Sequence, residues 1–281
     1  MSRVLLTGST GFIGKFAKIR LLDDGHDVFE FKDYKGDITD PCVWEKIPKV
    51  DIVIHAAALT FVPDSWTYSY DFFNVNFMGT ICALEYCKKF KARLIFFSSY
   101  LYGNQKIIPI VEEAELNCLN PYSLSKKLGE DACKFYSDNY SISVSVIRPF
   151  NIYGPGQNDI FLIPQLLKQI INGKEVIVKD LKPKRDYVYI HDLIDLISKI
   201  IDKDFRFIVV NAGSGVSYSV IEIINIIQGI VGSNLEITST DQNRNAEINN
   251  SLADITKAYE YFNWKPQWTF SAGIIDILKT L

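Results

Sequence analysis

Short apolar segments rich in valine, isoleucine and phenylalanine recur along the chain. Several consecutive residues in each are apolar, so both faces of an extended strand would be apolar. Strands of this kind are typical of a parallel sheet that is covered by helices on both faces. The segments read RVLLTG, DVFEF, DIVIHAAA, RLIFFSS, ISVSVIRPF and FIVVNAG. The pattern therefore predicts a central, buried parallel sheet.

Longer segments with a helical spacing of apolar residues lie between these strands, among them FIGKFAKIRLLDDG, VNFMGTICALEYCKKF and LSKKLGEDACKFYSDNY. Strands and helices that alternate in this way form a doubly wound sheet, because each connection crosses one of its faces. The predicted fold class is therefore α/β, with a Rossmann-type doubly wound parallel sheet in residues 1–150.

After residue 150 the pattern is less regular. A helix is expected at LIPQLLKQIING, a strand at EVIV, a basic loop at KDLKPKRDY and a helix from about His191. The strand FIVVNAG, in the segment 187–215, is expected to return to the central sheet. The remaining segments, 151–186 and 216–281, are expected to form a smaller α/β lobe at the C-terminal end.

Composition and charge narrow the possible partners. The chain has 281 residues, a formal net charge of -3 and a sequence pI near 5.7. This charge gives no general attraction to nucleic acid or to an anionic membrane, so neither is expected as a partner. Its apolar runs fall short of the ~18 residues of a membrane span, and MSRVLLTGST lacks a secretory layout. We therefore expect a cytoplasmic protein. Its five cysteines form no CxxC pair, which favours reduced thiols over a metal site.

A glycine-rich segment, TGSTGFIG, follows the first predicted strand and opens the first predicted helix. Gly8 permits a tight turn, Gly11 lets the backbone approach a pyrophosphate, and Gly14 lets the helix pack closely on the strand. The amino terminus of the helix then offers amide donors and a positive dipole end. A dinucleotide is the predicted ligand, bound by Gly8, Gly11, Phe12, Ile13 and Gly14.

The end of the second predicted strand bears on the choice between NAD and NADP. An acidic side chain there binds the ribose 2′-hydroxyl and repels a 2′-phosphate. Lys32 stands where that acid is commonly found, Asp33 follows it, and Lys35 is close by. The lysines favour NADP and the aspartate favours NAD, whereas a solvated turn would explain both lysines without a ligand. On balance the segment favours NADP slightly.

Two further segments are predicted to border the dinucleotide. Asp37 in GDITD could accept a hydrogen bond from adenine, with Ile38 beside it. Ala56 and Ala57 follow the strand that ends at His55, and their small side chains leave room for a cofactor. His55 itself is expected to be a packed histidine rather than a catalyst.

The segment LNPYSLSKKLGE places Tyr122 four positions before Lys126 at the start of a predicted helix that Asn-Pro caps. Residues four apart share one helix face, so the phenol and the ammonium can act together. A neighbouring cation and a helix amino terminus are expected to lower the pKa of the phenol from about 10. Ser98 and Ser99, at the end of RLIFFSS, could bind the same substrate oxygen.

With these features together, the chain resembles the extended short-chain dehydrogenases/reductases of the nucleotide-sugar epimerase/dehydratase type. The resemblance runs nearly end to end, and the order of its motifs argues against chance similarity. The matching segments are TGSTGFIG, GDITD, HAAA, NVNFMGT, FFSSYLYG, YSLSK, RPFNIYGPGQ, RDYVYIHD, VNAGSG and NWKP.

The resemblance implies roles for individual residues. Ser98 takes the place of the catalytic Ser/Thr, Tyr122 that of the acid and base, and Lys126 that of the partner which also binds the nicotinamide ribose. Asn76 matches the structural asparagine of the active site, and both Asn76 and Pro149 are placed at the cofactor.

The implied substrate is a nucleotide sugar, bound by the lobe of residues 151–186 and 216–281. The arginines among its implied contacts, Arg185 and Arg244, would grip the diphosphate, unless they form ordinary surface ion pairs. Family members commonly dimerise, which implies a homodimer through the helix VNFMGTICALEYCKKF and the helix that carries Tyr122. The implied substrate-binding residues are Ser98, Ser99, Tyr100, Asn151, Arg185 and Arg244.

Family members oxidise or reduce a sugar carbon, commonly C4, with a nicotinamide. The 4,6-dehydratases carry an Asp/Glu pair, or a Glu, just after the catalytic Ser/Thr, whereas this chain has Ser99, Tyr100 and Leu101 there. A reductase of a 4-keto-6-deoxy nucleotide sugar is favoured by Lys32, and a 4-epimerase with tightly bound NAD is the alternative. A non-catalytic NADP-binding scaffold is a third possibility, but such a protein would be expected to have lost the tyrosine or the lysine.

Overall fold

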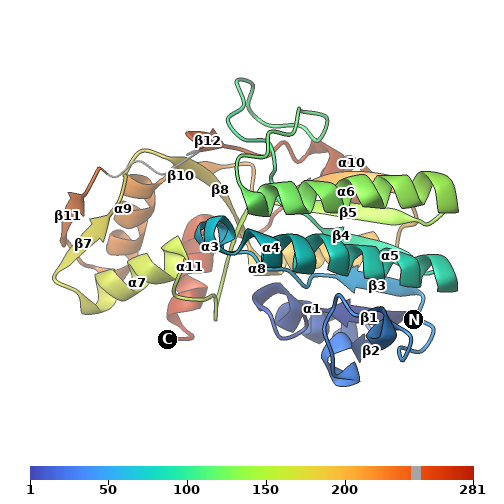
Figure 1. The fold of residues 1–281 in the computed structure, drawn as a ribbon. Helices are drawn as coiled ribbons and strands as arrows, with labels where there is room; N and C mark the ends of the chain where they lie inside the picture. The colour runs from blue at the N-terminus through green and yellow to red at the C-terminus, as the bar shows by residue number, and fades with distance from the viewer. Residues whose placement is uncertain (242–247) are drawn as a thin grey trace.

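The computed structural model describes residues 1–241 and 248–281. Its centre is a six-stranded parallel sheet with helices on both faces, as Figure 1 shows. The predicted fold class is confirmed. In spatial order the strands are β2 (Asp27–Glu30), β1 (Arg3–Thr7), β3 (Ile52–His55), β4 (Arg93–Phe97), β5 (Val144–Pro149) and β9 (Phe207–Ala212).

The two faces of the sheet carry separate hydrophobic clusters. Leu5 and Leu6 are neighbours in β1 and belong to different clusters, because successive side chains of a strand point to opposite faces. The Leu6 cluster includes residues of α1 and α8, and the Leu5 cluster includes residues of α2, α5 and α6. These helices are α1 (Phe12–Asp23), α2 (Pro41–Trp44), α5 (Gly79–Phe90), α6 (Pro121–Tyr140) and α8 (Ile190–Ile201).

Two helical segments, the π-helical turn η2 (Phe73–Met78) and α6, lie on the face of the sheet that carries the Leu5 cluster. The turn η2 joins α5 to the short helices α3 (Val62–Thr67) and α4 (Ser69–Phe72). Helix α6 begins at a capping box, in which the Ser123 amide donates to Asn120 Oδ1 at 2.8 Å and the Asn120 amide donates to Ser123 Oγ at 3.2 Å. The predicted cap is confirmed. Within the described residues, no helix is both long and apolar enough to cross a membrane.

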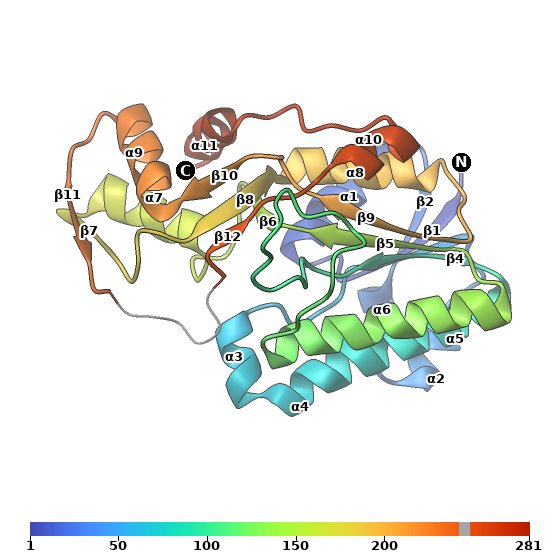
Figure 2. The ribbon, with the colours of Figure 1, turned by 90° about the horizontal axis from the view of Figure 1, so that it is seen from above.

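A smaller lobe lies beyond the carboxyl ends of the central strands, as Figures 1 and 2 show. Its middle strand is β8 (Lys184–Tyr189), which pairs in parallel with β6 (Asn151–Tyr153) and β12 (Asn250–Ser251) and antiparallel with β10 (Ser217–Ser219). A separate parallel pair is formed by β7 (Glu175–Val178) and β11 (Glu236–Ser239). Helices α7 (Leu162–Asn172), α9 (Val220–Val231) and α11 (Phe270–Leu278) belong to this lobe, whereas α10 (Thr256–Phe262) packs beside β9 and α8 of the central unit.

The predicted basic loop KDLKPKRDY is correct for residues 179–183 and wrong for its last residues, which from Lys184 onward belong to strand β8. Its first residues, Lys184 and Arg185, are partly exposed, whereas the segment from Asp186 to Tyr189 is buried. The alternating tyrosine and valine side chains that follow the basic residues favour a strand. The run of basic residues therefore concealed a strand whose second half enters the core.

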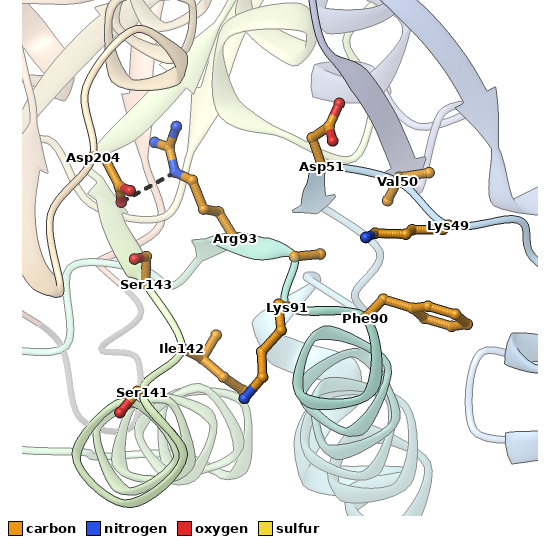
Figure 3. Close-up of a pocket in the computed structure, with 11 residues that line it drawn as sticks. Lys49, Val50, Asp51, Phe90, Lys91, Arg93, Ser141, Ile142, Ser143 and Asp204 are labelled. Carbon is orange, nitrogen blue, oxygen red and sulfur yellow. Dashed lines mark ion pairs between the residues drawn. The ribbon is translucent and has the colours of Figure 1, made fainter.

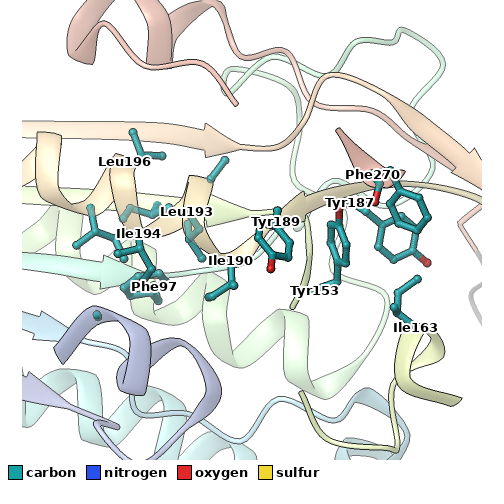
Figure 4. Packing of buried hydrophobic residues seen from close by; sticks show 14 of the residues in the cluster. Phe97, Tyr153, Ile163, Tyr187, Tyr189, Ile190, Leu193, Ile194, Leu196 and Phe270 are labelled. Carbon is teal, nitrogen blue, oxygen red and sulfur yellow. Dashed lines mark hydrogen bonds between the residues drawn. The ribbon is translucent and has the colours of Figure 1, made fainter. Parts of the chain in front are cut away.

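Aromatic side chains fill the core of the smaller lobe. Figure 4 shows Tyr153, Tyr187, Tyr189 and Phe270 close together, and Ile190 of α8 continues the same cluster. The ring centres of Tyr153 and Phe270 are 5.0 Å apart, and those of Tyr153 and Tyr189 are 5.2 Å apart. The apolar interior is therefore continuous from the smaller lobe into the helical layer of the central sheet.

Candidate active site at the carboxyl ends of the central strands

The glycine loop has the shape of a phosphate cradle. Gly8 has a φ of +69°, and a Cβ atom there would lie 2.7 Å from the Ala57 amide nitrogen. A Cβ atom on Gly14 would lie 2.0 Å from the Gly8 carbonyl oxygen, and the Gly11 amide donates to that oxygen at 2.9 Å. Helix α1 begins at the next residue, and no side chain caps its amides. The loop therefore fits a pyrophosphate at a helix amino terminus.

Thr7 and His55 join the ends of β1 and β3 behind this loop. Thr7 Oγ1 lies 3.0 Å from His55 Nδ1 and accepts a hydrogen bond from the Ala57 amide at 3.1 Å. Burial, and to a lesser extent the Lys126 cation, lower the pKa of His55 to about 3. His55 is thus a packed, neutral histidine that fixes the path of Ala56 and Ala57.

Strand β2 ends at Glu30, two residues before Lys32. Lys32 and Asp33 are exposed in the 3-10 turn η1 (Phe31–Tyr34). Glu30 is buried and forms ion pairs with Lys18 and Lys32. Sequence reasoning missed Glu30, because Phe31 extended the apolar strand pattern past the residue at which pairing ends. Its position as the last paired residue of β2 is the signal that would have found it.

Asp37 and Ile38 lie beyond this turn. Asp37 Oδ1 accepts hydrogen bonds from the Thr39 amide at 2.8 Å and the Thr39 hydroxyl at 2.7 Å, and these bonds lower the pKa of Asp37. The Ile38 carbonyl accepts from Trp44 Nε1 at 2.8 Å, and the Ile38 side chain faces Gly79. Asp37 therefore shapes its own turn and stays exposed and ionised, so a cofactor could still reach its other oxygen.

The predicted triad comes together where β4 ends and α6 begins. Tyr122 lies in the first turn of α6, and its phenol is close enough to Ser99 for that hydroxyl to influence its pKa. The Ser98 hydroxyl is buried and has no hydrogen-bond partner in the described part of the chain. Lys126, one turn after Tyr122, is buried with its Nζ 4.7 Å from the centre of the Phe96 ring.

The expectation of a lowered phenol pKa is wrong for the chain by itself. Burial raises the pKa of Tyr122 to about 12, and the Ser99 hydroxyl opposes this rise only in part. Burial also lowers the pKa of Lys126 to about 8. The Lys126 ammonium lies over the Phe96 ring, and burial, rather than this cation, dominates the pKa of the phenol.

Asn76 connects the π-helical turn to the helix that carries Tyr122. Its side-chain oxygen accepts from the Leu59 amide at 2.8 Å, and its Nδ2 donates to the Leu59 carbonyl and to Ser125 Oγ, each at 3.0 Å. This amide is therefore used by the protein itself. These contacts fit the structural role that the resemblance implied, and they use both N–H donors of the Asn76 amide within the protein.

The predicted substrate contacts lie between the two lobes. The Tyr100 hydroxyl donates to Asn151 Oδ1 at 3.3 Å, and Asn151 Nδ2 donates to the Asp186 carbonyl at 3.1 Å. Arg185 Nη1 donates to the Lys184 carbonyl at 2.9 Å and to the Ile248 carbonyl. Pro149, predicted at the cofactor, is the last residue of β5. Arg244, predicted at the substrate, lies outside the described residues.

Comparisons with known proteins agree with this geometry. The model of the NAD dependent epimerase/dehydratase family matches residues 4–213. The chain belongs to this family. A putative UDP-glucose 4-epimerase of Methanocaldococcus jannaschii is 31% identical, with 98% of this chain and 97% of that protein covered. The GDP-6-deoxy-D-mannose reductase of Pseudomonas aeruginosa is 28% identical, with 99% and 96% covered. A solved structure of RMD from Pseudomonas aeruginosa complexed with NADPH superimposes with a TM-score of 0.92 at 26% identity, with 100% and 98% covered.

Membership in the NAD dependent epimerase/dehydratase family confirms the resemblance and assigns a nicotinamide dinucleotide to the chain. The residues present fit that group on two counts. At Gly8 and Gly14 a side chain would collide with the backbone, so the loop stays bare and tightly folded, and the Ser98 hydroxyl is buried without a partner among the described residues.

One buried network of this family member escaped the sequence analysis. Arg148 donates through Nε and Nη2 to the two Glu130 carboxylate oxygens, at 2.9 and 2.6 Å. Its Nη1 donates to the Tyr102 hydroxyl and to the Glu112 carbonyl, each at 2.8 Å. In the sequence analysis, RPF, which contains Arg148, and YG, which contains Tyr102, were used only as motifs of the family resemblance. The charge of Arg148 and the hydroxyl of Tyr102 were the sequence features that could have indicated a buried polar network behind the site.

A surface cavity at the opposite edge of the sheet is not part of this site. Figure 3 shows Lys49, Lys91 and Arg93 around it, with Arg93 paired to Asp204 at 3.5 Å. It lies at the amino ends of β3, β4 and β5, whereas ligands of open α/β sheets bind at the carboxyl ends.

Proposed function

We propose that the chain is an NAD(P)-dependent oxidoreductase that transfers a hydride at a ring carbon, C4, of a nucleoside-diphosphate sugar. The observation that supports it best is the buried Ser98 hydroxyl just after β4, which has no partner among the described residues and precedes Ser99, the neighbour of Tyr122. A reacting carbinol or carbonyl oxygen would supply the partner that Ser98 lacks.

In the proposed reaction, Tyr122 exchanges a proton with the sugar oxygen while Ser98 holds that oxygen in place. The bound nicotinamide accepts or supplies the hydride. Lys126, one helical turn away and buried, would bind the nicotinamide ribose and stabilise the phenolate. Because burial alone raises the pKa of Tyr122 to about 12, a cation near the filled site is needed to bring it toward neutral pH.

We favour a reductase of 4-keto-6-deoxy nucleotide sugars. Ser99 and Tyr100 follow Ser98 where the 4,6-dehydratases of the resembling family carry carboxylates, so the proton transfers of dehydration lack a catalyst. Lys32, at the turn after β2, favours a cofactor that is consumed and exchanged in each reaction. The similarity to the GDP-6-deoxy-D-mannose reductase also supports this choice.

A 4-epimerase with tightly bound NAD is the second candidate. The similarity to the putative UDP-glucose 4-epimerase at 31% identity favours it. In either case we assign the lobe of residues 151–186 and 216–281 to the nucleotide sugar, with Asn151 and Arg185 as contacts. A non-catalytic scaffold is the weakest candidate, because Ser98, Tyr122 and Lys126 are all retained.

Two assays separate these candidates. In the first, the purified chain is given NADPH with 4-keto-6-deoxy sugars linked to GDP, dTDP, UDP or CDP, and loss of NADPH absorbance is followed. In the second, it is given UDP-glucose without added cofactor, and the C4 epimer is sought by NMR. We expect turnover in the first assay. Turnover in the second alone would make the chain an epimerase, and silence in both would remove the proposed reaction.

A Tyr122→Phe variant tests the assignment of the acid and base. We expect its turnover to fall by about 100-fold or more, because the phenolic proton is lost while the ring remains. Cofactor binding, measured by titration, should be preserved. Tyr140→Phe, at the far end of the same helix, is the matched control and should keep full activity. An active Tyr122→Phe protein would contradict the mechanism.

A further inference from the structure

The end of β2 holds an ionic cluster that joins three elements. The Glu30 carboxylate accepts from Lys18 of α1 through Oε1 and lies 3.1 Å from Lys32 Nζ through Oε2. The Glu30 side chain is only 10% exposed, whereas that of Lys32 is 48% exposed. The carboxylate therefore lies beneath the two ammonium groups, and Lys32 faces solvent.

This cluster adjoins the phosphate cradle. Burial would raise the pKa of Glu30, but the ammonium groups of Lys18 and Lys32 lower it to about 2. Glu30 pairs with Leu6 of β1, two residues before Gly8, and Lys18 belongs to the helix that the glycine loop opens, so the cluster lies beside the backbone that would receive the pyrophosphate. In a doubly wound sheet, the end of the second strand beside that loop is where the adenosine ribose is recognised.

Two chemistries could operate at this position. A free carboxylate would accept a hydrogen bond from the ribose 2′-hydroxyl and select NAD. In Glu30, however, each oxygen already accepts an ammonium group, and the side chain is almost covered. Lys32 uses one of its three N–H donors on Glu30 and has the others to offer. Two ammonium groups and one carboxylate also leave the cluster with a net positive charge.

We propose that Lys18 and Lys32, held in place by Glu30, form a binding site for the 2′-phosphate of the dinucleotide and select NADP over NAD. Lys32 is the direct contact, Lys18 adds a second positive charge at the other carboxylate oxygen, and Glu30 is the positioning residue. The inference rests on the family's dinucleotide cofactor and is independent of the proposed sugar and reaction. It assigns a selectivity to Glu30 and Lys18, which the sequence pattern did not single out.

The experiment is calorimetric titration of the purified, cofactor-free chain with NADPH and with NADH, in the absence of any sugar. We expect NADPH to bind at least about tenfold more tightly, the effect of one charge-assisted contact. Lys32→Gln should weaken NADPH binding by about tenfold and leave NADH binding unchanged. Lys18→Gln should weaken NADPH binding to a smaller extent.

Two further variants give the controls. Lys49→Gln makes the same change of charge at the opposite edge of the sheet and should leave both affinities unchanged. Glu30→Gln releases Lys18 and Lys32 from the carboxylate that positions them, so NADPH binding should weaken while NADH binding stays unchanged. Each variant is first checked for a normal thermal unfolding transition, and Lys18→Gln tests the inference if Lys32→Gln does not fold.

The opposite pattern would overturn the proposal. If the parent chain prefers NADH, and Glu30→Gln weakens NADH binding, then Glu30 is the ribose acceptor and the site selects NAD. Equal affinities for the two cofactors, or a loss of NADPH binding in Lys49→Gln as large as in Lys32→Gln, would also exclude a built 2′-phosphate site. Because no sugar is present, these results stand whatever the outcome of the turnover assays.

Discussion

At the scale of single residues, burial rather than ion pairing sets the protonation states around the candidate site. It raises the pKa of Tyr122 to about 12 and lowers that of Lys126 to about 8. It also keeps His55 neutral, and His55 Nε2 has no hydrogen-bond partner in residues 1–241 and 248–281. The chain by itself therefore holds a protonated phenol and a cationic lysine at pH 7. A bound ligand is needed to bring the pKa of the Tyr122 phenol closer to neutral pH beside the Lys126 ammonium.

His55 makes stability depend on pH. Its pKa is about 3 in the folded chain and 6.5 in the unfolded chain, so the unfolded state takes up a proton first as the pH falls. Its contribution to stability is complete above pH 6.5 and is lost below it, at about 1.4 kcal/mol per pH unit until the folded pKa is reached.

A His55→Asn variant, compared with the parent by urea unfolding at pH 7.5 and pH 5, tests this dependence. The parent should be the more stable of the two at pH 7.5, because His55 packs and bonds to Thr7. The difference in free energy of unfolding should shrink by roughly 2 kcal/mol at pH 5, since only the parent carries the buried histidine. A difference that stays constant with pH would show that His55 is already charged when folded.

At the scale of elements, α6 is fixed at several points along its length. The Asn120 box sets its start, Asn76 holds Ser125 from the π-helical turn, and Arg148 of β5 holds Glu130. Ser125 precedes Lys126 in sequence, and Glu130 lies one turn beyond it. The proton-transfer residues are therefore carried by an element whose rotation and position along the sheet are both determined by buried polar contacts.

The Glu130 and Arg148 pair should matter far more than a surface pair on the same helix. Glu130→Gln leaves the buried Arg148 cation without its counter-charge, which we expect to cost about 3 to 5 kcal/mol of unfolding free energy. The control is Asp138→Asn, which breaks an exposed ion pair with Lys134 and should cost less than about 1 kcal/mol.

Adding Arg148→Met to Glu130→Gln tests the reason for that loss. The double variant should be more stable than Glu130→Gln alone, because it no longer buries an unpaired charge. The measurement is the urea midpoint of the parent, Glu130→Gln, the double variant and the Asp138→Asn control. If the double variant is less stable than the single one, the contacts of Arg148 with Tyr102 and Glu112, rather than its charge, dominate.

The central sheet and the first turn of α6 could be predicted from sequence, because apolar strands and an Asn-Pro cap are local signals. β8 could not, because its basic first residues have the composition of a loop and its burial depends on partners far away in sequence. Glu30 was missed for a similar reason, since only pairing with β1 shows where β2 ends. The direction of the Tyr122 pKa was wrong because desolvation comes from the whole surrounding structure.

At the scale of the whole molecule, α5 and α6 lie side by side and form one outer face, as Figures 1 and 2 show. Large apolar side chains are exposed on α6 and on the π-helical turn that precedes α5, with exposed fractions of 41% for Leu124, 54% for Phe135 and 44% for Met78. Exposed apolar residues on neighbouring helices favour association. The homodimer predicted from the resemblance therefore stays our proposal, with this face as its interface.

Light scattering at micromolar concentration should give twice the chain mass of 32.0 kDa. Phe135→Lys should shift the mass toward that of one chain, because it places a charge in the proposed interface. Ile177→Lys, a similar change at an exposed residue of β7, should leave the dimer intact. A single-chain mass for the parent protein would contradict the proposal.

The direct passage from β8 into α8 limits how the molecule can move. Tyr189 is both the last residue of the strand and the N-cap of the helix. No flexible linker therefore lies between β8 of the smaller lobe and α8, which packs on the central sheet. One residue joins β5 to β6 in the same way. Two such short connections resist a hinge motion of one lobe relative to the other. Substrates would then be admitted by local rearrangement of rim segments, and changes in those segments could alter which sugars enter while the frame that carries Tyr122 stays unchanged.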